Sequence, residues 1–570
     1  MITVEKRAYR LEVEPTAAWL HSAEGELLLC LRPAAALDTV GAADETLALE
    51  EPRLVGDTVE IRRRSTVWDE AVTELVCGEE QLEVRTRVSG RGRLTDVHLL
   101  GFRALLPGGP TGFQATISPM RSLFSPGPGD AARIVRPAGE SLGIGVTGDG
   151  ALGRGHYFFT PAPLYLALTT ATVEDPAEGG PWLDLGVAAP VEQLTFSHLV
   201  YDAGDRLFSL RLEYEGHTEV AGEFEAPGLV LTPGVPDPYT GLRRHRDDLT
   251  ARGAAPPAAE REVPDWWLAP IFCGWGAQVQ LAQEAGVPWG STATQAAYDG
   301  FLAELEAHGL VPGTVVIDDK WQSTYGANEP DPDKWPDLAG WIAERHARGQ
   351  KVLLWWKAWD PEGLDPELRV RTPDGTAVGL DPSNPATREF LGEMVARLLS
   401  SGGLDADGLK IDFTARTPVG RALSAHGPAW GIALLHELLR VIYDAAKAAK
   451  ADALLITQTP HPAFVDVADM LRLNDMLRID DPGPRRIVAQ MRYRAAVAAG
   501  ACPELPIDTD DWQAPSLAEW RDYLEAKAEL GVPALYYAGA LDATGERFAP
   551  EDWAALRRAW AARGVRERVS

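Results

Sequence analysis

The residues best suited to chemistry are charged and aromatic side chains that follow short apolar runs in the second half of the chain. Lys410 and Asp412 stand two residues apart in Gly408-Leu-Lys-Ile-Asp-Phe413, so on a β-strand they would share a face. A nearby ammonium favours an ionised carboxylate, which would suit Asp412 as a nucleophile, while Lys410 could donate hydrogen bonds to a bound polyol. The alternative is a structural ion pair.

Two further carboxylates, Asp480 and Asp481, follow the apolar run that begins at Met476. If either lies close to Asp412, repulsion would raise its pKa and suit it to protonate a leaving oxygen near neutral pH. Two carboxyl groups facing one cavity are the minimal equipment for splitting a glycosidic bond. An Asp-Asp-Pro-Gly-Pro sequence is also typical of a turn or a helix cap.

Other polar and aromatic residues at the ends of apolar runs are candidates for holding a sugar. These are Asp318, Asp319, Trp355, Lys410, Trp275, Lys357, Gln458 and His461. Each also has a structural interpretation, because Trp fills large cores and a lone His near a Pro commonly makes a structural hydrogen bond. Asp508-Thr-Asp-Asp511 lacks the Gly and the distal Glu of a calcium loop, so we expect no metal there, and the proposed chemistry needs no cofactor.

The elements that must position these residues alternate between short apolar strands and amphipathic helices after residue 262, which predicts a parallel sheet with helical crossovers. The expected strands are Leu268–Gly274, Gly313–Asp318, Lys351–Trp356, Gly408–Phe413, Ala453–Gln458, Met476–Asp480, Glu504–Asp508 and Pro533–Tyr537. Eight strands with interleaved helices favour a β/α (TIM) barrel, in which the C-terminal strand ends carry the chemistry.

The first two hundred or so residues predict a different type of fold. Alternating runs such as Thr58–Arg62 and Gln81–Arg87, separated by Gly- and Pro-rich turns, are typical of antiparallel strands. A helix is expected over Tyr239–Arg252, followed by a polar linker. We therefore predict an N-terminal antiparallel β-sandwich with a linker helix over residues 1–262 and a catalytic eight-stranded β/α barrel over residues 263–570.

Composition restricts the class of partner and the compartment. The 570-residue chain has a net charge of −29, and such a surface repels phosphate backbones and anionic lipids, so we expect neither nucleic acid nor membrane as a partner. Four scattered cysteines suggest neither a disulfide scaffold nor a zinc site. With no signal-like N-terminus and no apolar run of membrane-spanning length, a cytoplasmic location is expected.

The order of four segments resembles the retaining α-glycosidases of glycoside hydrolase clan D, and family 36, the α-galactosidases and raffinose-synthase relatives, most of all. The segments are Ile317-Asp-Asp-Lys-Trp-Gln322, Trp335-Pro-Asp-Leu338, Gly349-Gln-Lys-Val-Leu-Leu-Trp355 and Gly408-Leu-Lys-Ile-Asp-Phe413. The resemblance implies that Asp412 is the nucleophile and Asp480 the acid/base, with Asp481 as the alternative. Lys320 stands where that family has Gly, and Thr457-Gln-Thr-Pro-His461 replaces a Cys- and Gly-rich loop, so the sugar stays open.

The resulting hypothesis is a retaining, exo-acting, α-galactosidase-like glycosidase that cleaves a terminal α-linked sugar from an oligosaccharide or glycoside by double displacement. A family-31-like α-glucosidase or α-xylosidase and a transglycosylase are the alternatives within enzymes. A carbohydrate-binding protein without chemistry is the alternative outside them. A homo-oligomer is compatible with the sequence, which does not fix the oligomeric state.

Overall fold

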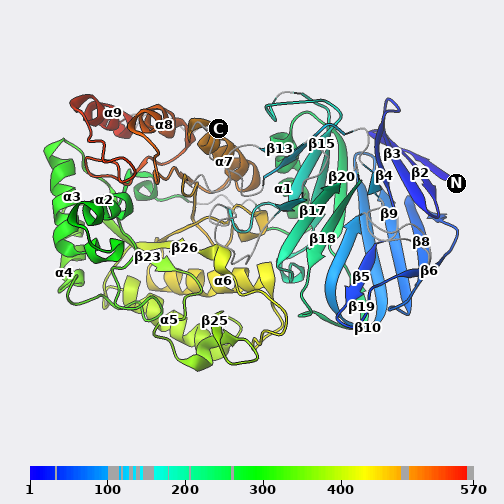
Figure 1. Ribbon diagram of the computed structural model, residues 1–570, viewed down its shortest axis with the longest axis horizontal. Helices are drawn as coiled ribbons and strands as arrows, with labels where there is room; N and C mark the ends of the chain where they lie inside the picture. Colours follow the sequence, from blue (N-terminus) through cyan, green and yellow to red (C-terminus); the bar gives the residue numbers. More distant parts are fainter. Residues whose placement is uncertain are drawn as a thin grey trace.

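A β-sandwich and a β/α barrel lie side by side in the molecule (Figure 1), which confirms the predicted fold class. The structure, a computed structural model, describes residues 1–32, 35–100, 115–116, 120–126, 133–135, 141–144, 159–177, 179–204, 207–257, 262–476 and 487–561. The predicted boundary at residue 262 lies between the linker helix and the first barrel strand.

The sandwich consists of two antiparallel sheets joined by one long strand, β10 (Leu82–Leu100). One sheet contains β1 (Ile2–Glu5), β2 (Tyr9–Glu14), β3 (Ala17–Ser22), β4 (Leu27–Leu31), β5 (Ala36–Thr39), β11 (Ala115–Thr116), β14 (Ser141–Ile144), β17 (His198–Gly204) and β18 (Leu207–Glu213). The other contains β6 (Thr46–Leu49), β7 (Arg53–Val55), β8 (Thr58–Ser65), β9 (Glu70–Cys77), β12 (Ser122–Ser125), β13 (Arg133–Val135), β15 (Tyr165–Thr169), β16 (Trp182–Ala188), β19 (Glu219–Glu225) and β20 (Gly228–Val235). Alternating buried and partly exposed residues, as in β2, place one face of the sheet on the core.

Helix α1 (Pro238–Ala251) follows the sandwich, within a residue of its predicted start and end. Asp237 caps its N-terminus by accepting hydrogen bonds from the backbone N–H groups of Tyr239 and Thr240. The helix packs against α7 (Ile487–Ala501) of the barrel, and Arg246 of α1 forms a partly buried ion pair with Glu504 at 3.1 Å. The linker helix is therefore part of the contact between the two domains.

The barrel strands pair in parallel in chain order around the sheet: β21 (Ile271–Cys273), β22 (Thr314–Ile317), β23 (Lys351–Lys357), β26 (Gly408–Asp412), β27 (Leu454–Thr457), β28 (Met470–Arg472), β29 (Ile507–Asp508) and β30 (Ala534–Leu535). β30 pairs with β21, and a bridge between Asp508 and Val532 links the β29 end to the β30 end. Eight parallel strands thus form a nearly closed barrel.

Helices cover the outside of the barrel (Figure 1). They are α2 (Trp275–Ala285), α3 (Gln295–Ala307), α4 (Leu338–Ala347), α5 (Pro385–Leu399), α6 (Gly431–Ala449), α7, α8 (Leu517–Leu530) and α9 (Pro550–Ala561), and a small hairpin of β24 (Arg369–Arg371) and β25 (Ala377–Leu380) precedes α5. Between β27 and β28 the described chain forms only the short 3₁₀ turn η6 (Pro462–Phe464). This unit of the barrel therefore lacks its helix.

The sixth strand is where the sequence prediction was wrong. It was expected at Met476–Asp480, of which only Met476 lies within the described residues, but the strand that pairs with β27 and β29 is Met470–Arg472. A strand that ends in Arg does not have the apolar pattern of a buried strand, and the Arg472 side chain is buried because it pairs with acidic residues at the ends of other strands. The polar residues at the end of strand six are therefore Arg472, Asn474 and Asp475.

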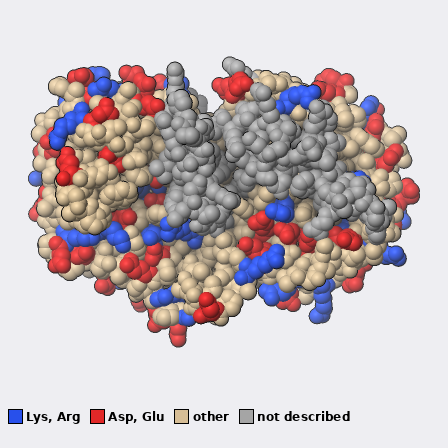
Figure 2. Space-filling model, in the orientation of Figure 1, with Lys and Arg blue, Asp and Glu red and all other residues tan. Residues whose placement is uncertain are grey.

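The surface shows no segregation of charge on the face drawn in Figure 2, where Lys and Arg side chains are interspersed with Asp and Glu. Within the described residues, no helix combines the length and apolar character needed to cross a bilayer.

Candidate active site

The barrel interior holds a buried polar cluster at the ends of β21, β22 and β26. Lys410 donates to Asp318 Oδ2 at 2.7 Å, and the Cys273 thiol donates to the same oxygen at 3.0 Å. The Tyr298 hydroxyl accepts from the backbone N–H of Asp318 at 2.7 Å. Burial lowers the pKa of Lys410, but Asp318 and Cys273 outweigh burial and raise it, so the ammonium stays charged. Both predicted residues of this cluster, Asp318 and Lys410, are thus fixed in position.

Asp412, the last residue of β26, receives hydrogen bonds from three sides. Trp355 Nε1 donates to Oδ2 at 3.2 Å, and Oδ1 accepts from the Phe413 backbone N–H at 2.8 Å and from Arg472 at 3.0 Å. Burial raises the pKa of the carboxyl, but Arg472 and Lys410 outweigh it, so the pKa lies below its ordinary value. Asp412 is therefore ionised, and its side chain is 16% exposed.

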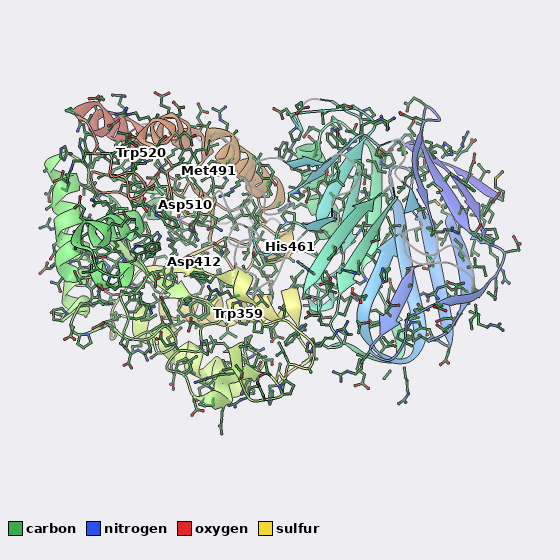
Figure 3. All side chains as sticks on the ribbon, viewed as in Figure 1. Trp359, Asp412, His461, Met491, Asp510 and Trp520 are labelled. Atoms are coloured by element: carbon green, nitrogen blue, oxygen red, sulfur yellow. The ribbon has the colours of Figure 1, made fainter. Side chains whose placement is uncertain are left out.

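Arg472, at the end of β28, is the residue that connects the carboxylates. One nitrogen, Nη2, donates to Asp412 and to Gln458 Oε1 at 2.8 Å. The other, Nη1, donates to Asp475 at 2.9 Å and to Asp510 at 2.8 Å. Carboxyl groups that follow strands four, six and seven therefore meet on one guanidinium, and Figure 3 shows Asp412 and Asp510 inside the barrel domain.

Asp475 and Asp412 bind different nitrogens of the same guanidinium, and the pKa values of their carboxyl groups are shifted in opposite directions. Burial raises the pKa of Asp475, Arg472 opposes this, and the nearby Asp510 and Asp412 raise it further, to about 7. The Asp475 side chain is 18% exposed, whereas that of Asp510 is fully buried. Asp412 and Asp475 can thus both reach a ligand in the barrel mouth, one as a carboxylate and the other as an acid near neutral pH.

Asp319 and Lys357 lie in a second group, at the ends of β22 and β23. Tyr325 is at its centre, with Lys320 Nζ 3.5 Å and Lys357 Nζ 3.9 Å from the ring centroid. Lys357 also pairs with Asp360 at 2.6 Å. Burial and the charge of Asp318 raise the pKa of Asp319 to about 6. The Tyr325 ring lies 5.8 Å from the Trp355 ring, so this group borders the Asp412 site.

The remaining predicted binding residues fall in different places. Gln458 is fully buried and contacts Arg472, while its backbone carbonyl accepts from Thr160 of the sandwich at 2.9 Å. Trp275 begins α2 and packs edge-to-face with Trp512 and Trp289. His461 caps the η6 turn, its Nδ1 accepting from the Ala463 N–H at 3.1 Å, and burial lowers its pKa to about 3. Its contacts, this hydrogen bond and the edge-to-face packing of its ring on Phe464, are those of a structural residue.

Asp480 and Asp481, the predicted acid/base candidates, lie outside the described residues. Arg472, Asp475 and Asp510 were not singled out as site residues from the sequence. The Arg472-Leu-Asn-Asp475 segment carries the signal that could have located Arg472 and Asp475, since an Arg and an Asp three residues apart follow a short apolar run.

Several solved structures are similar to this chain. A GH31 family sulfoquinovosidase from E. rectale, with an aza-sugar inhibitor, matches at 12% identity with a TM-score of 0.58, over 98% of this chain and 82% of that one. An α-galactosidase from Thermus thermophilus in complex with stachyose matches at 16% identity with a TM-score of 0.53, over 84% of this chain and 97% of that one. A cycloalternan-degrading enzyme from Trueperella pyogenes matches at 13% identity with a TM-score of 0.52, over 97% of this chain and 82% of that one.

This chain has the fold of these enzymes. The resemblance to glycoside hydrolases that the sequence motifs suggested is thereby confirmed for the fold. No protein-family model and no curated protein sequence matches the chain. Among the described residues, no group of three or more His, Cys, Asp or Glu side chains is arranged to hold a metal ion.

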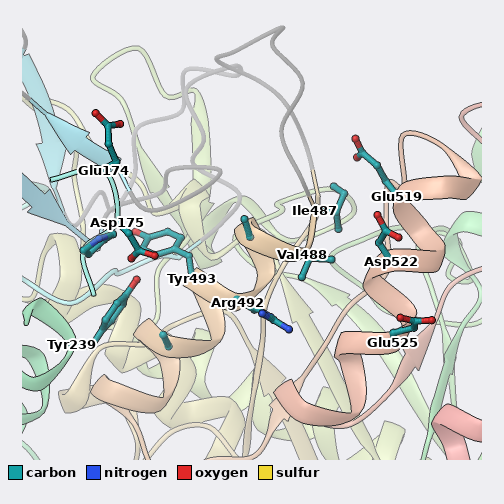
Figure 4. A pocket seen from close by; sticks show the side chains of 13 residues that line it. Glu174, Asp175, Tyr239, Ile487, Val488, Arg492, Tyr493, Glu519, Asp522 and Glu525 are labelled. Atoms are coloured by element: carbon teal, nitrogen blue, oxygen red, sulfur yellow. The ribbon is translucent and has the colours of Figure 1, made fainter. Parts of the chain in front are cut away.

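A separate cavity of about 820 Å³ lies between the sandwich, α1, α7 and α8 (Figure 4). Its lining combines two tyrosines, Tyr239 and Tyr493, with the carboxylates of Glu519, Asp522 and Glu525 on α8. Of the predicted site residues that the structure describes, none lines it, so we assign the chemistry to the barrel interior.

Proposed function

We propose that the protein is a retaining, exo-acting α-glycosidase of the α-galactosidase-like type, with Asp412 as its nucleophile. The observation that carries the proposal is the pair of partly exposed carboxyl groups, Asp412 and Asp475, bound to one guanidinium with pKa values shifted in opposite directions. A retaining glycosidase needs two carboxyl groups about 5–5.5 Å apart, one ionised and one protonated. The shared fold with glycoside hydrolases supports the same function.

In the first step, an Asp412 oxygen attacks the anomeric carbon and forms a glycosyl ester, while the acid donates its proton to the departing oxygen. In the second step, the same group, now a carboxylate, removes a proton from water as the water attacks the anomeric carbon. The bond to Asp412 then breaks and the carboxylate is restored. No oxidant, metal or organic cofactor takes part in this sequence of bonds.

Three carboxyl groups are candidates for the acid. The sequence points to Asp480 or Asp481, whereas the geometry and the raised pKa favour Asp475. Asp318, Asp319, Lys410 and Trp355 would hold the terminal sugar, with Trp275, Lys357 and Gln458 nearby. Asp318 and Lys410 already bind each other, so a sugar hydroxyl would join an existing hydrogen-bonded cluster.

The identity of the terminal sugar is also open. The similar structures include an α-galactosidase bound to stachyose, which favours a galactoside, and a GH31 family sulfoquinovosidase, which favours a sulfoquinovoside and keeps the family-31-like alternative open. Transfer to an acceptor hydroxyl in place of water would use the same residues. A carbohydrate-binding protein would need the same barrel mouth, but would gain nothing from the opposite pKa shifts of Asp412 and Asp475.

The test is hydrolysis of para-nitrophenyl α-glycosides by the wild type and the Asp412→Asn variant. The panel holds the galactoside, glucoside, xyloside, arabinopyranoside, N-acetylgalactosaminide and sulfoquinovoside. We expect release from one glycoside, with the α-anomer as the first product by NMR, and a loss of at least about 10³-fold in the variant. Activity retained by Asp412→Asn would exclude it as the nucleophile, and a β-anomer as first product would exclude retention.

A further inference from the structure

Trp289 is an exposed aromatic residue at the barrel rim that the proposed residues leave unused. Its side chain is 51% exposed, and it is the only aromatic residue among the large apolar side chains that are exposed in the described parts of the chain. It begins the 3₁₀ turn η3 (Trp289–Thr292), which follows α2. An exposed tryptophan beside a ligand site is a candidate for contact with the ligand, because burying its ring on binding is favourable.

The turn that carries Trp289 is held firmly. The Thr292 hydroxyl donates to the Gln278 carbonyl at 2.8 Å, and Trp335 Nε1 donates to the Ala293 carbonyl at 2.8 Å. Lys334 Nζ donates to the carbonyl of Gly290 at 3.0 Å and to that of Lys320 at 2.7 Å. The exposure of Trp289 is therefore a property of an anchored turn.

A continuous set of contacts joins this turn to the nucleophile. At Gly290 a Cβ atom would lie 2.7 Å from Lys320 Cγ, so the turn packs directly on the Lys320 side chain. Lys320 covers the Tyr325 ring, which lies 5.8 Å from the Trp355 ring, and Trp355 donates to Asp412. Trp289 thus stands at the edge of the same barrel mouth.

A second set of contacts places Trp289 on the side of the acid. Its ring centroid is 6.3 Å from that of Trp275, and Trp275 is 5.7 Å from Trp512, both edge-to-face. Trp512 donates its backbone N–H to Asp510 and accepts from the N–H of Met476, the neighbour of Asp475. With Asp475 as the acid that protonates the leaving oxygen, the leaving group would lie on this side of the scissile bond.

We propose that Trp289, backed by Trp275 and Trp512, is a stacking platform for a sugar ring in the leaving group, so that the natural substrate is an oligosaccharide. This rests on the proposed glycosidase function. The ring face of Trp289 would cover the apolar C–H face of the leaving saccharide. Binding energy gained there would be used in the transition state of an oligosaccharide and not in that of a substrate without a leaving sugar.

The experiment compares leaving groups in Trp289→Ala, Trp289→Phe and the control Val311→Ala, whose side chain is 61% exposed just before β22, at the opposite end of that strand. Substrates are α-galactosyl fluoride against melibiose and stachyose, or α-glucosyl fluoride against isomaltotriose if the panel selects the glucoside. We expect Trp289→Ala to lower kcat/KM about five- to tenfold for the oligosaccharides and leave the fluoride unchanged, with Trp289→Phe in between and Val311→Ala like the wild type.

Equal effects on the fluoride and the oligosaccharides, or no effect on either, would overturn the platform while leaving the glycosidase intact. If the wild type hydrolyses nothing, the proposed function fails separately, and calorimetric binding of stachyose and isomaltotriose decides about the platform. Binding that Trp289→Ala weakens would support the platform, and binding that is absent or unchanged in that variant would overturn it.

Discussion

At the scale of single residues, the site is organised by the charge balance around Arg472. A buried guanidinium needs acidic partners, and the fully buried Asp510, which accepts from Arg472 and from the backbone N–H groups of Asp511 and Trp512, is one of them. Asp412 and Asp475 also pair with the Arg472 guanidinium, and the Lys410 ammonium further stabilises the ionised form of Asp412. One ionised and one neutral carboxyl is therefore the favoured state of the pair.

This balance predicts the pH dependence of hydrolysis. A general acid works while protonated, so activity should be present below the Asp475 pKa and be lost as the pH rises through about 7. The nucleophile must be ionised, and the pKa of Asp412 lies below its ordinary value, so the acid limb should lie below about 3.9, the ordinary Asp pKa. Profiles of kcat/KM against pH measure both limbs.

Asp475→Asn should abolish the alkaline limb and slow the release of a sugar leaving group by about 10²–10⁴-fold. The glycosylation rate of a para-nitrophenyl glycoside should fall less, because para-nitrophenolate leaves without being protonated. Asp480→Asn and Asp481→Asn are the matched variants. If one of them removes the limb and Asp475→Asn does not, the acid lies where the sequence prediction placed it.

At the scale of elements, the sequence predicted most of the barrel because its strands are short apolar runs bounded by turns and helix caps. β22, β23, β26 and β27 were each placed to within about a residue of their observed limits. β28 was not, because the burial of Arg472 depends on Asp412 and Asp510, which lie far away in sequence. The carboxyl of Asp475 was missed for the same reason, since its place follows from that of β28.

The opposite end of the barrel is held by Asp407, which precedes β26 and lies away from the proposed chemistry. Its carboxylate accepts from the backbone N–H of Val352 at 2.9 Å, from His346 at 2.7 Å and from Lys351 at 3.0 Å. Burial raises the pKa of Asp407, but these bonds and Lys450 lower it below its ordinary value. The stabilisation is therefore complete above the ordinary pKa of Asp and is lost as the pH falls through the folded-state pKa.

Asp407→Asn should lower the free energy of unfolding at pH 7 by about 3 kcal/mol, because it leaves buried donors with a weaker partner. Hydrolysis by the folded variant should be unchanged, since strand stability and chemistry lie at opposite ends of a barrel. Asp405→Asn is the control. Asp405 pairs with Lys450 at 2.9 Å but is 40% exposed, so its loss should cost less than about 1 kcal/mol. Urea titrations measure both, and equal costs would contradict the assignment.

At the scale of the whole molecule, the sandwich supports the chain segment that leaves the nucleophile. Residues 413–430 connect β26 to α6, and two residues of the sandwich domain contact the middle and the far end of this segment. Glu215 accepts from the Gly420 N–H at 2.8 Å, and the His217 ring stacks on Trp430 with centroids 3.7 Å apart. The backbone N–H of Ile432 donates to the carbonyl of Phe196 at 3.1 Å. The sandwich therefore contributes to the order of the barrel mouth.

Gly431, at the start of α6, tests this docking. Its φ is +55°, which favours glycine, and a Cβ atom there would lie 1.8 Å from the carbonyl oxygen of Phe196 in the sandwich domain. Gly431→Ala must therefore separate the two domains locally or distort the 413–430 segment. We expect it to lower the free energy of unfolding by more than about 1 kcal/mol, the minimum for an incompatible backbone, and to reduce kcat/KM as well.

Gly300→Ala provides the matched control, because Gly300 lies within α3 with no atom within 4 Å of the added Cβ. The same substitution there should stabilise the protein by up to about 1 kcal/mol through helix propensity and leave hydrolysis unchanged. Thermal unfolding together with kcat/KM distinguishes the two sites. A Gly431→Ala variant as stable and as active as Gly300→Ala would mean that the sandwich does not constrain the segment after Asp412, and the barrel mouth would then owe its order to the barrel alone.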